Sequence, residues 1–193
     1  MGIILGLTGF AMSGKDEVAD ELVRNYGFTK IGMSDTLHEC LMVLNPIAAF
    51  DYVSVEAIRY RDYCEEVGYV EAKKNPEVRA LLQRLGTEVG RNMIDEDIWV
   101  NAMLNKARRH LAVVVTGIRY PNEANACLFT WNVVRPGYGP VNDHSSEALA
   151  AEINASGNHL TIVNDGTLEQ LYESVREAHA ATFGGTKIHN IFD

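Results

Sequence analysis

Two glycines and a lysine near the start of the chain have the spacing of a phosphate-binding loop. Gly9 and Gly14 are separated by four residues, and Lys15 follows directly. In this pattern the glycines permit a backbone whose N–H groups converge on phosphate oxygens, and the lysine reaches the β and γ phosphates. The loop stands between a short apolar run and a helical pattern, which is the context that the motif requires. The alternative is a plain glycine-rich turn with an exposed lysine. The predicted phosphate contacts are Gly9, Ala11, Met12, Ser13, Gly14, Lys15 and Asp16.

The residue after Lys15 departs from the usual pattern. Asp16 stands where a Ser or Thr would bring a hydroxyl group to Mg²⁺. A carboxylate can also hold the metal, directly or through a water molecule, so Asp16 is a candidate metal ligand. The alternative is an acid in the first turn of a helix, where the helix dipole favours negative charge.

Arginines are the expected partners of two phosphate groups that must approach each other, because guanidinium groups bind phosphate in a bidentate manner. Arg119, which closely follows a predicted strand, is the strongest candidate for the reacting phosphates. Arg135 opens a Gly/Pro-rich loop, and Arg84 and Arg91 lie in a long helical stretch. For each arginine the alternative is a surface salt bridge.

The elements that must position these residues alternate between strands and helices. Helical patterns separate the apolar runs, which favours a parallel, doubly wound sheet with its ligands at the carboxyl ends of the strands. A helix is also expected from Ser34 or Asp35 to just before Pro46, and a short one around residues 122–129. The predicted strands are Ile3–Leu7, Phe28–Met33, Leu111–Thr116, Trp131–Arg135 and His159–Val163.

A long insertion between the second and third predicted strands has helical periodicity throughout, from Ser54 to about Arg109. Pro76 suits the first turn of a helix, and Asp95 is expected to open the last one. One apolar face is predicted to be formed by Leu81, Leu82, Leu85 and Val89.

Composition is that of an ordinary globular domain, with 193 residues, 47% of them hydrophobic. The formal net charge of −9 argues against nonspecific nucleic-acid binding, so any phosphate must be held locally. No stretch approaches the roughly 20 apolar residues that span a bilayer, and no targeting segment is recognisable, which favours a cytoplasmic location. Three widely spaced cysteines, Cys40, Cys64 and Cys127, are expected to be reduced thiols.

Several segments resemble the deoxynucleoside monophosphate kinases of bacteriophages. Gly14-Lys15-Asp16 looks like the loop of these enzymes and, more distantly, of phosphomevalonate kinase. The similarity is ordered along nearly the whole chain. The further similar segments are Leu85–Arg91 with Asp95–Val100, Val113–Glu123 and its Arg119-Tyr120-Pro121-Asn122-Glu123 ending, and Arg135–Gly137 with His144–Glu147.

This resemblance implies an α/β fold, a three-layer P-loop kinase with a parallel sheet of about five strands. It implies a single domain over residues 1–193, with a helical acceptor-binding lobe at about 36–109 and a lid loop at about 136–147. The implied activity is transfer of phosphate from ATP, with Mg²⁺, to a deoxynucleoside 5′-monophosphate. A phage origin would place the protein in the host cytoplasm.

One departure from the family pattern falls at Gly117, where related chains usually end the third strand with Asp. Either Asp16 and Asp35 serve the metal, or ATP phosphates and water hold most of the Mg²⁺ coordination sphere. Asp35 is expected to position substrate or metal, with a helix N-cap as the alternative.

Other binding residues are also implied by the resemblance. The segment Asn164, Asp165 and Gly166 resembles the loop by which related kinases pack the adenine of ATP, through its backbone. His144 is expected to contact ligands from the lid, and Trp99 and Tyr63 are candidates to stack on the acceptor base. The predicted substrate-binding residues are Asp35, Arg84, Arg91, Trp99, Arg119, Arg135 and His144.

Two other functions stay open. One is a different P-loop small-molecule kinase, of the phosphomevalonate or dephospho-coenzyme A type, and the other is a module that binds ATP without transferring phosphate. The expected partners are small molecules, with neither nucleic acid nor membrane. The sequence leaves open the accepted bases, the choice between ribose and deoxyribose, and the oligomeric state, a homodimer included.

Overall fold

The computed structural model describes residues 2–51, 56–139 and 160–185. The chain divides into two compact units. The sheet unit comprises Met1–Met33 and Met103–Asp193, and the insertion unit comprises Ser34–Ala102.

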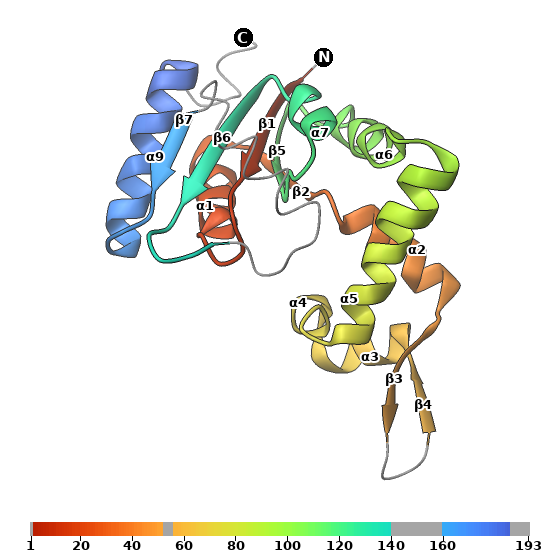
Figure 1. Ribbon diagram of the computed structural model, residues 1–193. Helices are drawn as coiled ribbons and strands as arrows, with labels where there is room; N and C mark the ends of the chain where they lie inside the picture. Colours follow the sequence, from red (N-terminus) through yellow and green to blue (C-terminus); the bar gives the residue numbers. More distant parts are fainter. Residues whose placement is uncertain (1, 52–55, 140–159, 186–193) are drawn as a thin grey trace. The chain divides into compact units, whose positions relative to one another are not determined.

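The sheet unit contains a five-stranded sheet in the order β2-β5-β1-β6-β7 (Figure 1). Every neighbouring pair is parallel, with Leu5 opposite Val114 on one side of β1 and opposite Phe129 on the other. The prediction of a five-stranded parallel sheet is confirmed. The strands are β1 (Ile3–Thr8), β2 (Thr29–Gly32), β5 (Ala112–Thr116), β6 (Phe129–Val134) and β7 (Leu160–Val163).

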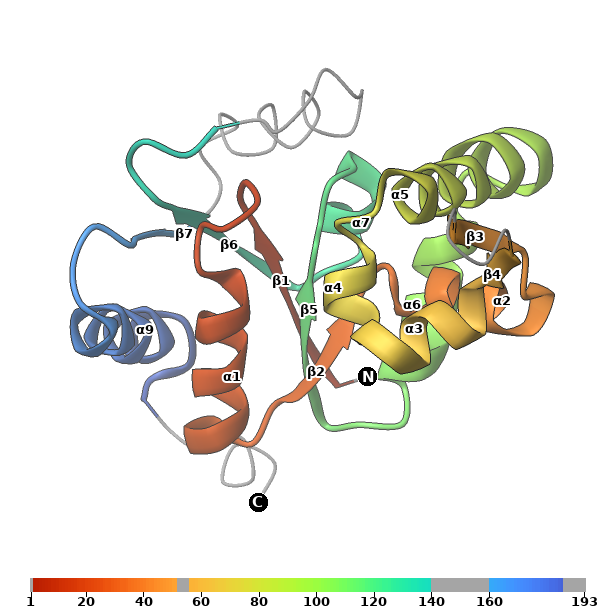
Figure 2. The ribbon, with the colours of Figure 1, turned by 90° about the horizontal axis from the view of Figure 1, so that it is seen from below.

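Helices cover both faces of this sheet. Figure 2 shows α1 (Lys15–Tyr26) and α9 (Leu168–Phe183) on one face and the short α7 (Pro121–Asn125) on the other. Leu5 and Leu7 are fully buried beneath α1 and α9 because both faces of β1 are covered. This packing fixes the carboxyl end of β1, from which the glycine-rich loop leaves the sheet.

The insertion unit is less helical than the sequence predicts. A two-stranded antiparallel ribbon pairs Ile47 with Arg59 and Phe50 with Ala57, so the expectation of helix throughout from Ser54 is wrong. Pro46 ends the preceding helix, and the apolar run that follows it pairs with the later strand. The elements are α2 (Asp35–Leu44), β3 (Ile47–Asp51), β4 (Glu56–Arg59), α3 (Tyr60–Val67), α4 (Tyr69–Ala72), α5 (Pro76–Gln83), η1 (Arg84–Ile94) and the first half of α6 (Ile98–Ala107).

The segment η1 is a π-helix, and its wider turn alters which side chains share a face. The amide of Asp95 donates to the carbonyl of Gly90, five residues earlier. Leu81, Leu82 and Leu85 pack against the core of the unit as predicted. Val89 is 38% exposed, since a face extrapolated at 3.6 residues per turn does not continue through a π-helix.

The ends of several elements differ from the predicted ones by a few residues. The last helix of the insertion begins at Ile98 rather than at Asp95, whose side chain accepts a hydrogen bond from the amide of Asp97. The short helix α7 ends at Asn125, and Phe129 already belongs to β6. The predicted and observed starts of α5 agree at Pro76.

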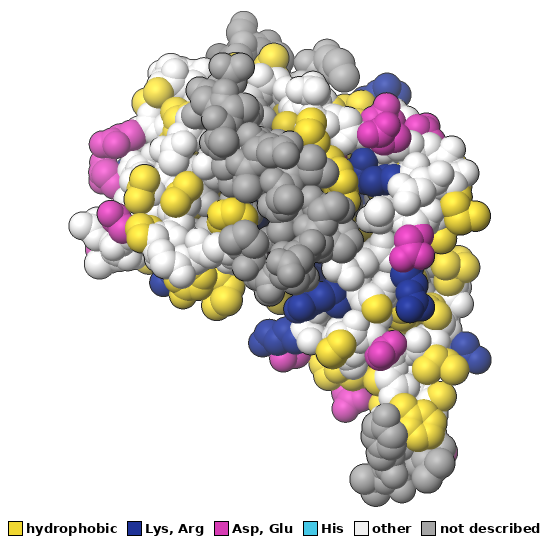
Figure 3. Space-filling model, in the orientation of Figure 1, with side chains coloured by type: hydrophobic (Ala, Val, Ile, Leu, Met, Phe, Trp, Pro, Cys, Tyr) yellow, Lys and Arg dark blue, Asp and Glu magenta, His cyan; other side chains and the backbone are white. Residues whose placement is uncertain are grey.

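Apolar side chains lie on the surface of the insertion unit around the end of α2 and β3 (Figure 3). Val43 is 80% exposed, and Ile47 and Phe50 are 57% and 43% exposed. The buried residues of the unit, among them Tyr60 and Val78, form a core separate from that of the sheet unit.

The three cysteines are free thiols, as expected. Burial raises the pKa of Cys127 to about 12, which makes this thiol a poor nucleophile. Among the helices in the described ranges, none combines the length and apolar character needed to cross a membrane.

Candidate functional site

The loop between β1 and α1 has a backbone that depends on glycine. Gly9 and Gly14 have φ angles of +136° and +102°, and Met12 between them has +62°. A Cβ atom on Gly9 would lie 2.2 Å from the carbonyl oxygen of Val133. The loop therefore packs directly on β6, and a side chain at Gly9 is excluded by both conformation and space.

Lys15 is folded over this loop. Its Nζ donates to the carbonyl oxygen of Phe10 at 2.6 Å and lies 3.4 Å from the hydroxyl of Ser13. The amide of Ser13 also donates to Phe10, at 3.2 Å, and closes a turn. The ammonium group thus lies on the phosphate-binding loop itself, where the motif predicts it to meet phosphate.

The N-terminus of α1 opens at this loop without a side-chain cap. Gly14 is the N-cap residue, and no side chain accepts a hydrogen bond there. The first N–H groups of a helix lack partners within the helix, and the helix dipole adds partial positive charge at this end. Together with Lys15 this arrangement is suited to bind an anion.

The carboxylate of Asp16 is 79% exposed and forms an ion pair with Lys30 of β2, at 2.8 Å. Lys30 also pairs with Asp20 at 3.1 Å. Burial lowers the pKa of Lys30, but hydrogen bonds and charge from Asp16 and Asp20 outweigh it, and the net pKa is raised. Lys30 therefore stays protonated and competes with a cation for Asp16.

Mg²⁺ commonly binds through one or two carboxylates, water and substrate phosphates. Among the described residues, no three acidic, His or Cys side chains gather as a metal site. The exposed carboxylate of Asp16 at the phosphate-binding loop fits such a sparsely coordinated ion. Asp35 lies in the insertion unit, in the first turn of α2.

Arg119 follows β5 by three residues and is exposed. Its backbone N–H donates to Glu123 Oε2 at 2.8 Å, and the N–H of Tyr120 reaches the same oxygen at 3.2 Å. Glu123 is only 4% exposed. Sequence reasoning assigned no role to Glu123, although a Glu in the first turn of a helix is a recognised signal for capping the preceding backbone. It fixes the backbone that carries Arg119.

Gly117 lies between β5 and Arg119, with a φ angle of +82°. No atom lies within 4 Å of the position that a Cβ would take. The position at which the resemblance implies an Asp therefore has free space around it and a left-handed backbone.

Arg135 reaches the phosphate-binding loop from the end of β6. Its Nη1 lies 3.5 Å from the carbonyl oxygen of Met12, at the limit of a hydrogen bond. Its guanidinium group also lies over the ring of Tyr138, 4.7 Å from the centroid. The structure therefore places Arg135 beside the phosphate-binding loop, and its contact with substrate stays a prediction.

Asn164 follows β7 and contacts the phosphate-binding loop through its side chain. Its Nδ2 donates to the carbonyl oxygen of Ser13 at 2.9 Å. This contact was not predicted, since the resemblance implied only backbone contacts from this segment. Asp165 and Gly166 are exposed beside it.

In the insertion unit, Trp99 is 7% exposed. Its indole N–H donates to the carbonyl of Gly86 at 2.7 Å, and a Cβ on Gly90 would overlap its ring. Arg91 donates to the carbonyl of Glu96 at 2.9 Å, and Arg84 is exposed. Stacking of Trp99 on an acceptor base stays a prediction, and the observed contacts give the indole a role in packing.

The N-terminal end of α2, where Asp35 lies, is held by a polar cluster. The hydroxyl of Tyr69 donates to the carbonyl of Ser34 at 3.3 Å, and Lys73 Nζ lies 3.4 Å from the Ser34 hydroxyl. His38 stacks on Tyr69 with ring centroids 3.9 Å apart. Burial, followed by the charge of Lys73, lowers the pKa of His38 although Asp35 and Glu39 oppose the shift. Lys73 is a cation in this region that sequence reasoning missed.

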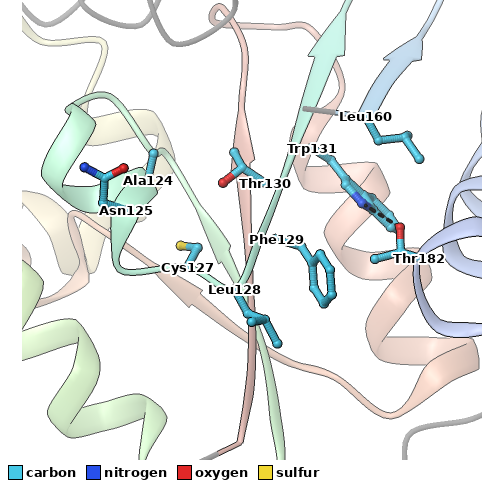
Figure 4. Close-up of a pocket in the computed structure, with 9 residues that line it drawn as sticks. All are labelled: Ala124, Asn125, Cys127, Leu128, Phe129, Thr130, Trp131, Leu160 and Thr182. Carbon is cyan, nitrogen blue, oxygen red and sulfur yellow. Dashed lines mark hydrogen bonds between the residues drawn. The ribbon is translucent and has the colours of Figure 1, made fainter. Parts of the chain in front are cut away.

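The predicted lid loop lies mostly outside the described residues, and His144 lies wholly outside them. A pocket of about 330 Å³ is lined by Cys127, Phe129, Trp131, Leu160 and Thr182 (Figure 4). It lies at the amino ends of β6 and β7, whereas the phosphate-binding loop follows the carboxyl end of β1. Because these strands are parallel, the pocket is at the opposite edge of the sheet from the candidate site.

Comparison with known proteins identifies the family of the chain. Residues 35–175 match the model of the family described as "Deoxynucleotide monophosphate kinase", which covers well over half of the chain. The chain belongs to the deoxynucleotide monophosphate kinase family. Membership in this family supports a nucleotide-binding phosphotransferase.

A viral relative of this kinase family is similar along most of the chain. It is a protein of Acanthamoeba polyphaga mimivirus named "Putative deoxynucleotide monophosphate kinase". It is 24% identical over 198 residues, which covers 90% of this chain and 94% of the viral one.

Two solved structures are similar to this chain along most of their length. The crystal structure of TT1252 from Thermus thermophilus has a TM-score of 0.52 and 18% identity, with 94% of this chain and 98% of that chain covered. A dephospho-CoA kinase from Campylobacter jejuni has a TM-score of 0.47 and 15% identity, with 92% and 96% covered.

Proposed function

We propose that this kinase transfers the γ-phosphoryl group of ATP to a deoxynucleoside 5′-monophosphate. The bond between the γ phosphorus and the β–γ bridging oxygen breaks, and an oxygen of the acceptor phosphate forms the new bond. The products are ADP and a deoxynucleoside diphosphate. The family assignment and the viral relative support the choice of acceptor.

The observation that carries this proposal is the loop from Gly9 to Lys15. It combines a glycine-dependent backbone, an uncapped helix N-terminus and a lysine folded over the loop. These features together suit a triphosphate chain better than a single small anion, because several N–H groups and the ammonium group of Lys15 are available along one loop.

Charge neutralisation is the main chemical task at such a site. An acceptor phosphate is already largely ionised near neutral pH, so it needs no general base, and catalysis depends on alignment and electrostatics. In this proposal Lys15 and Arg119 bind the reacting phosphates, and Arg135 binds beside the loop. Asp16 holds Mg²⁺, with Asp35 as a further candidate. The ion, when bound, neutralises charge on the phosphate oxygens.

The insertion unit is proposed to bind the acceptor. Its candidate contacts are Asp35, Arg84, Arg91 and Trp99, and the lysine found beside Asp35, Lys73, adds positive charge near the start of α2. Bidentate arginines suit a monophosphate dianion. The backbone of Asn164, Asp165 and Gly166 is proposed to contact the adenine of ATP, and His144 is proposed to contact ligands from the lid.

A coupled assay of ADP formation tests this function directly. Wild-type protein receives ATP, Mg²⁺ and each of the four deoxynucleoside monophosphates in turn, with the matching ribonucleotides, phosphomevalonate and dephospho-coenzyme A as competing acceptors. We expect ADP release that depends on a deoxynucleoside monophosphate and a diphosphate product in equal amount.

Other outcomes have distinct meanings. Release of ADP at one rate with and without any acceptor would contradict the proposal. Turnover only with phosphomevalonate or dephospho-coenzyme A would assign a different acceptor to the same fold. Tight ATP binding without turnover on any acceptor would indicate a binding module.

A further inference from the structure

Asn164 connects two loops that the proposed function places at the two ends of ATP. Its side-chain Nδ2 donates to the carbonyl oxygen of Ser13 at 2.9 Å, across 151 residues of sequence. Its own backbone N–H donates to the carbonyl of Val134 at 2.7 Å. The side chain therefore extends from a backbone that β6 holds in place.

The segment that follows Asn164 is also firmly anchored. Thr167 caps α9, with its hydroxyl accepting from the amide of Gln170 at 3.3 Å and its own amide donating to the Gln170 side chain at 2.7 Å. A reciprocal pair of this kind satisfies two helix-terminal donors. Asn164 thus lies between a paired strand and a capped helix, and this fixed backbone suits it to hold the phosphate-binding loop in place.

Gly14 is shaped to receive the Asn164 side chain. A Cβ on Gly14 would lie 2.5 Å from Asn164 Nδ2, so the amide packs directly against the glycine. Gly14 also has a φ angle of +102°. The glycine of the motif is therefore needed for this contact as well as for its conformation.

The hydrogen bond to Ser13 controls the direction of the next amide. Ser13 C=O and Gly14 N–H belong to one peptide unit, and in a planar trans peptide these two groups point in opposite directions. Because Asn164 holds the carbonyl from one side, the N–H of Gly14 is directed to the other. No cis peptide bond is present among the described residues.

We infer that Asn164 is a positioning residue for the phosphate-binding loop. Its amide fixes the Ser13–Gly14 peptide so that the Gly14 N–H is presented to the triphosphate before the nucleotide binds. The side-chain amide of Asn164 does not bind the nucleobase. The inference rests on the proposed function, in which this loop binds the phosphates of ATP.

Titration calorimetry with two ligands tests this role. Wild-type protein and the variants Asn164→Leu and Asn164→Ala are titrated with ATP and with inorganic tripolyphosphate, both with Mg²⁺. The Leu side chain has nearly the size of Asn but lacks the N–H donor. The Asn164→Ala variant is used if the Asn164→Leu protein does not fold. Loss of one such hydrogen bond is expected to weaken both ligands by the same factor, about tenfold.

Thr182→Val is the matched control for loss of stability. Thr182 accepts a hydrogen bond from the indole of Trp131 at 3.2 Å, at the far edge of the sheet (Figure 4). This variant is expected to lower the melting temperature and to leave tripolyphosphate binding unchanged. A loss of tripolyphosphate affinity equal to that of the Asn164 variants would show a merely structural effect and overturn the inference.

A steady-state readout separates positioning of ATP from a general defect. In the Asn164 variants the KM for ATP should rise about tenfold, whereas the KM for the acceptor should not change. Weaker binding of ATP with unchanged binding of tripolyphosphate would make the Asn164 side chain a nucleobase contact and overturn the inference. Unchanged binding of both ligands would also overturn the inference. Failure of the wild-type protein to bind either ligand would instead overturn the proposed function.

Discussion

The ammonium group of Lys15 lies 2.6 Å from the carbonyl oxygen of Phe10, five residues earlier in the same loop. A buried or half-buried ammonium must have hydrogen-bond acceptors, and this carbonyl supplies one. Phe10 also accepts from the amide of Ser13. Binding of a phosphate would offer Lys15 a charged acceptor in place of a neutral one, which makes a stronger hydrogen bond.

Replacement of Lys15 by Ala is expected to reduce the rate of phosphate transfer by about two to three orders of magnitude, the loss seen when a charge that stabilises a transition state is removed. The loop should persist, since Asn164 still holds Ser13. The measurement is kcat in the coupled assay, with thermal unfolding as the test of folding. Lys15→Arg keeps the charge and should retain more activity than Lys15→Ala. A fully active Lys15→Ala protein would exclude the loop as the reacting site.

Gly14→Ala is expected to destabilise the sheet unit and to abolish nucleotide binding. An Ala at a positive φ angle costs about 1–2 kcal/mol, and the new Cβ would also collide with Asn164 Nδ2. Urea unfolding and calorimetry with ATP measure the two effects.

Gly184→Ala is the control for the conformational cost alone. Gly184 ends α9 with a φ angle of +71°, and no atom lies within 4 Å of its added Cβ. This variant should lose about 1–2 kcal/mol of unfolding free energy and still bind ATP. Equal losses of stability in the two variants, with ATP binding retained in both, would show that Gly14 needs no space for Asn164.

The parallel sheet could be predicted because its strands are buried on both faces and appear as unbroken apolar runs, as at Ile3–Leu7. The phosphate-binding loop could be predicted because glycine and lysine spacing is local. The ribbon of β3 and β4 could not, since its pairing of Ile47 with Arg59 is set by contacts that helical periodicity does not report. The exposure of Val89 could not be predicted either, because the residue lies in a π-helix and the period of 3.6 residues does not apply there.

Positioning residues were the main omission at the candidate site. Glu123 holds the backbone of Arg119, and Asn164 holds that of Ser13. Glu123 has a local capping signal in the sequence. Asn164 has none, because its partner Ser13 lies 151 residues away and only the fold brings the two together.

Protonation of His179 in α9 is expected to destabilise the folded protein in acid. It is 0% exposed, and its two ring nitrogens have no hydrogen-bond partner in the part of the chain that the structure describes. Its ring stacks on Tyr26 with centroids 3.7 Å apart. Burial lowers the pKa of His179 below its ordinary value of 6.5, because the charged ring loses its hydration in the core.

The lowered pKa sets the direction of the pH effect. Below pH 6.5 the unfolded chain binds a proton at this residue that the folded protein does not, so the unfolding free energy falls as the pH falls. The decline ends at the lower folded-state pKa. Its slope for one proton is at most about 1.4 kcal/mol per pH unit. Urea unfolding between pH 5 and 8 should show this decline in the wild type, and His179→Phe should flatten it. An unchanged slope in His179→Phe would assign the decline to other groups.

Gly117→Asp is expected to strengthen the binding of Mg²⁺ at the site. The position follows β5, next to β1 and at the same sheet edge as the phosphate-binding loop, and its surroundings leave room for a side chain. Asp tolerates the φ angle of +82° better than most residues do. A carboxylate there would add a ligand or a water contact for the ion, and about 1 kcal/mol of added binding corresponds to roughly a fivefold lower half-saturating Mg²⁺ concentration.

Gly117→Asn has nearly the same shape and backbone cost without the charge, so the difference between the two variants isolates the carboxylate. Equal Mg²⁺ dependence of the Asp and Asn variants would show that the ion does not reach this edge of β5, and that Asp16 and the phosphates suffice.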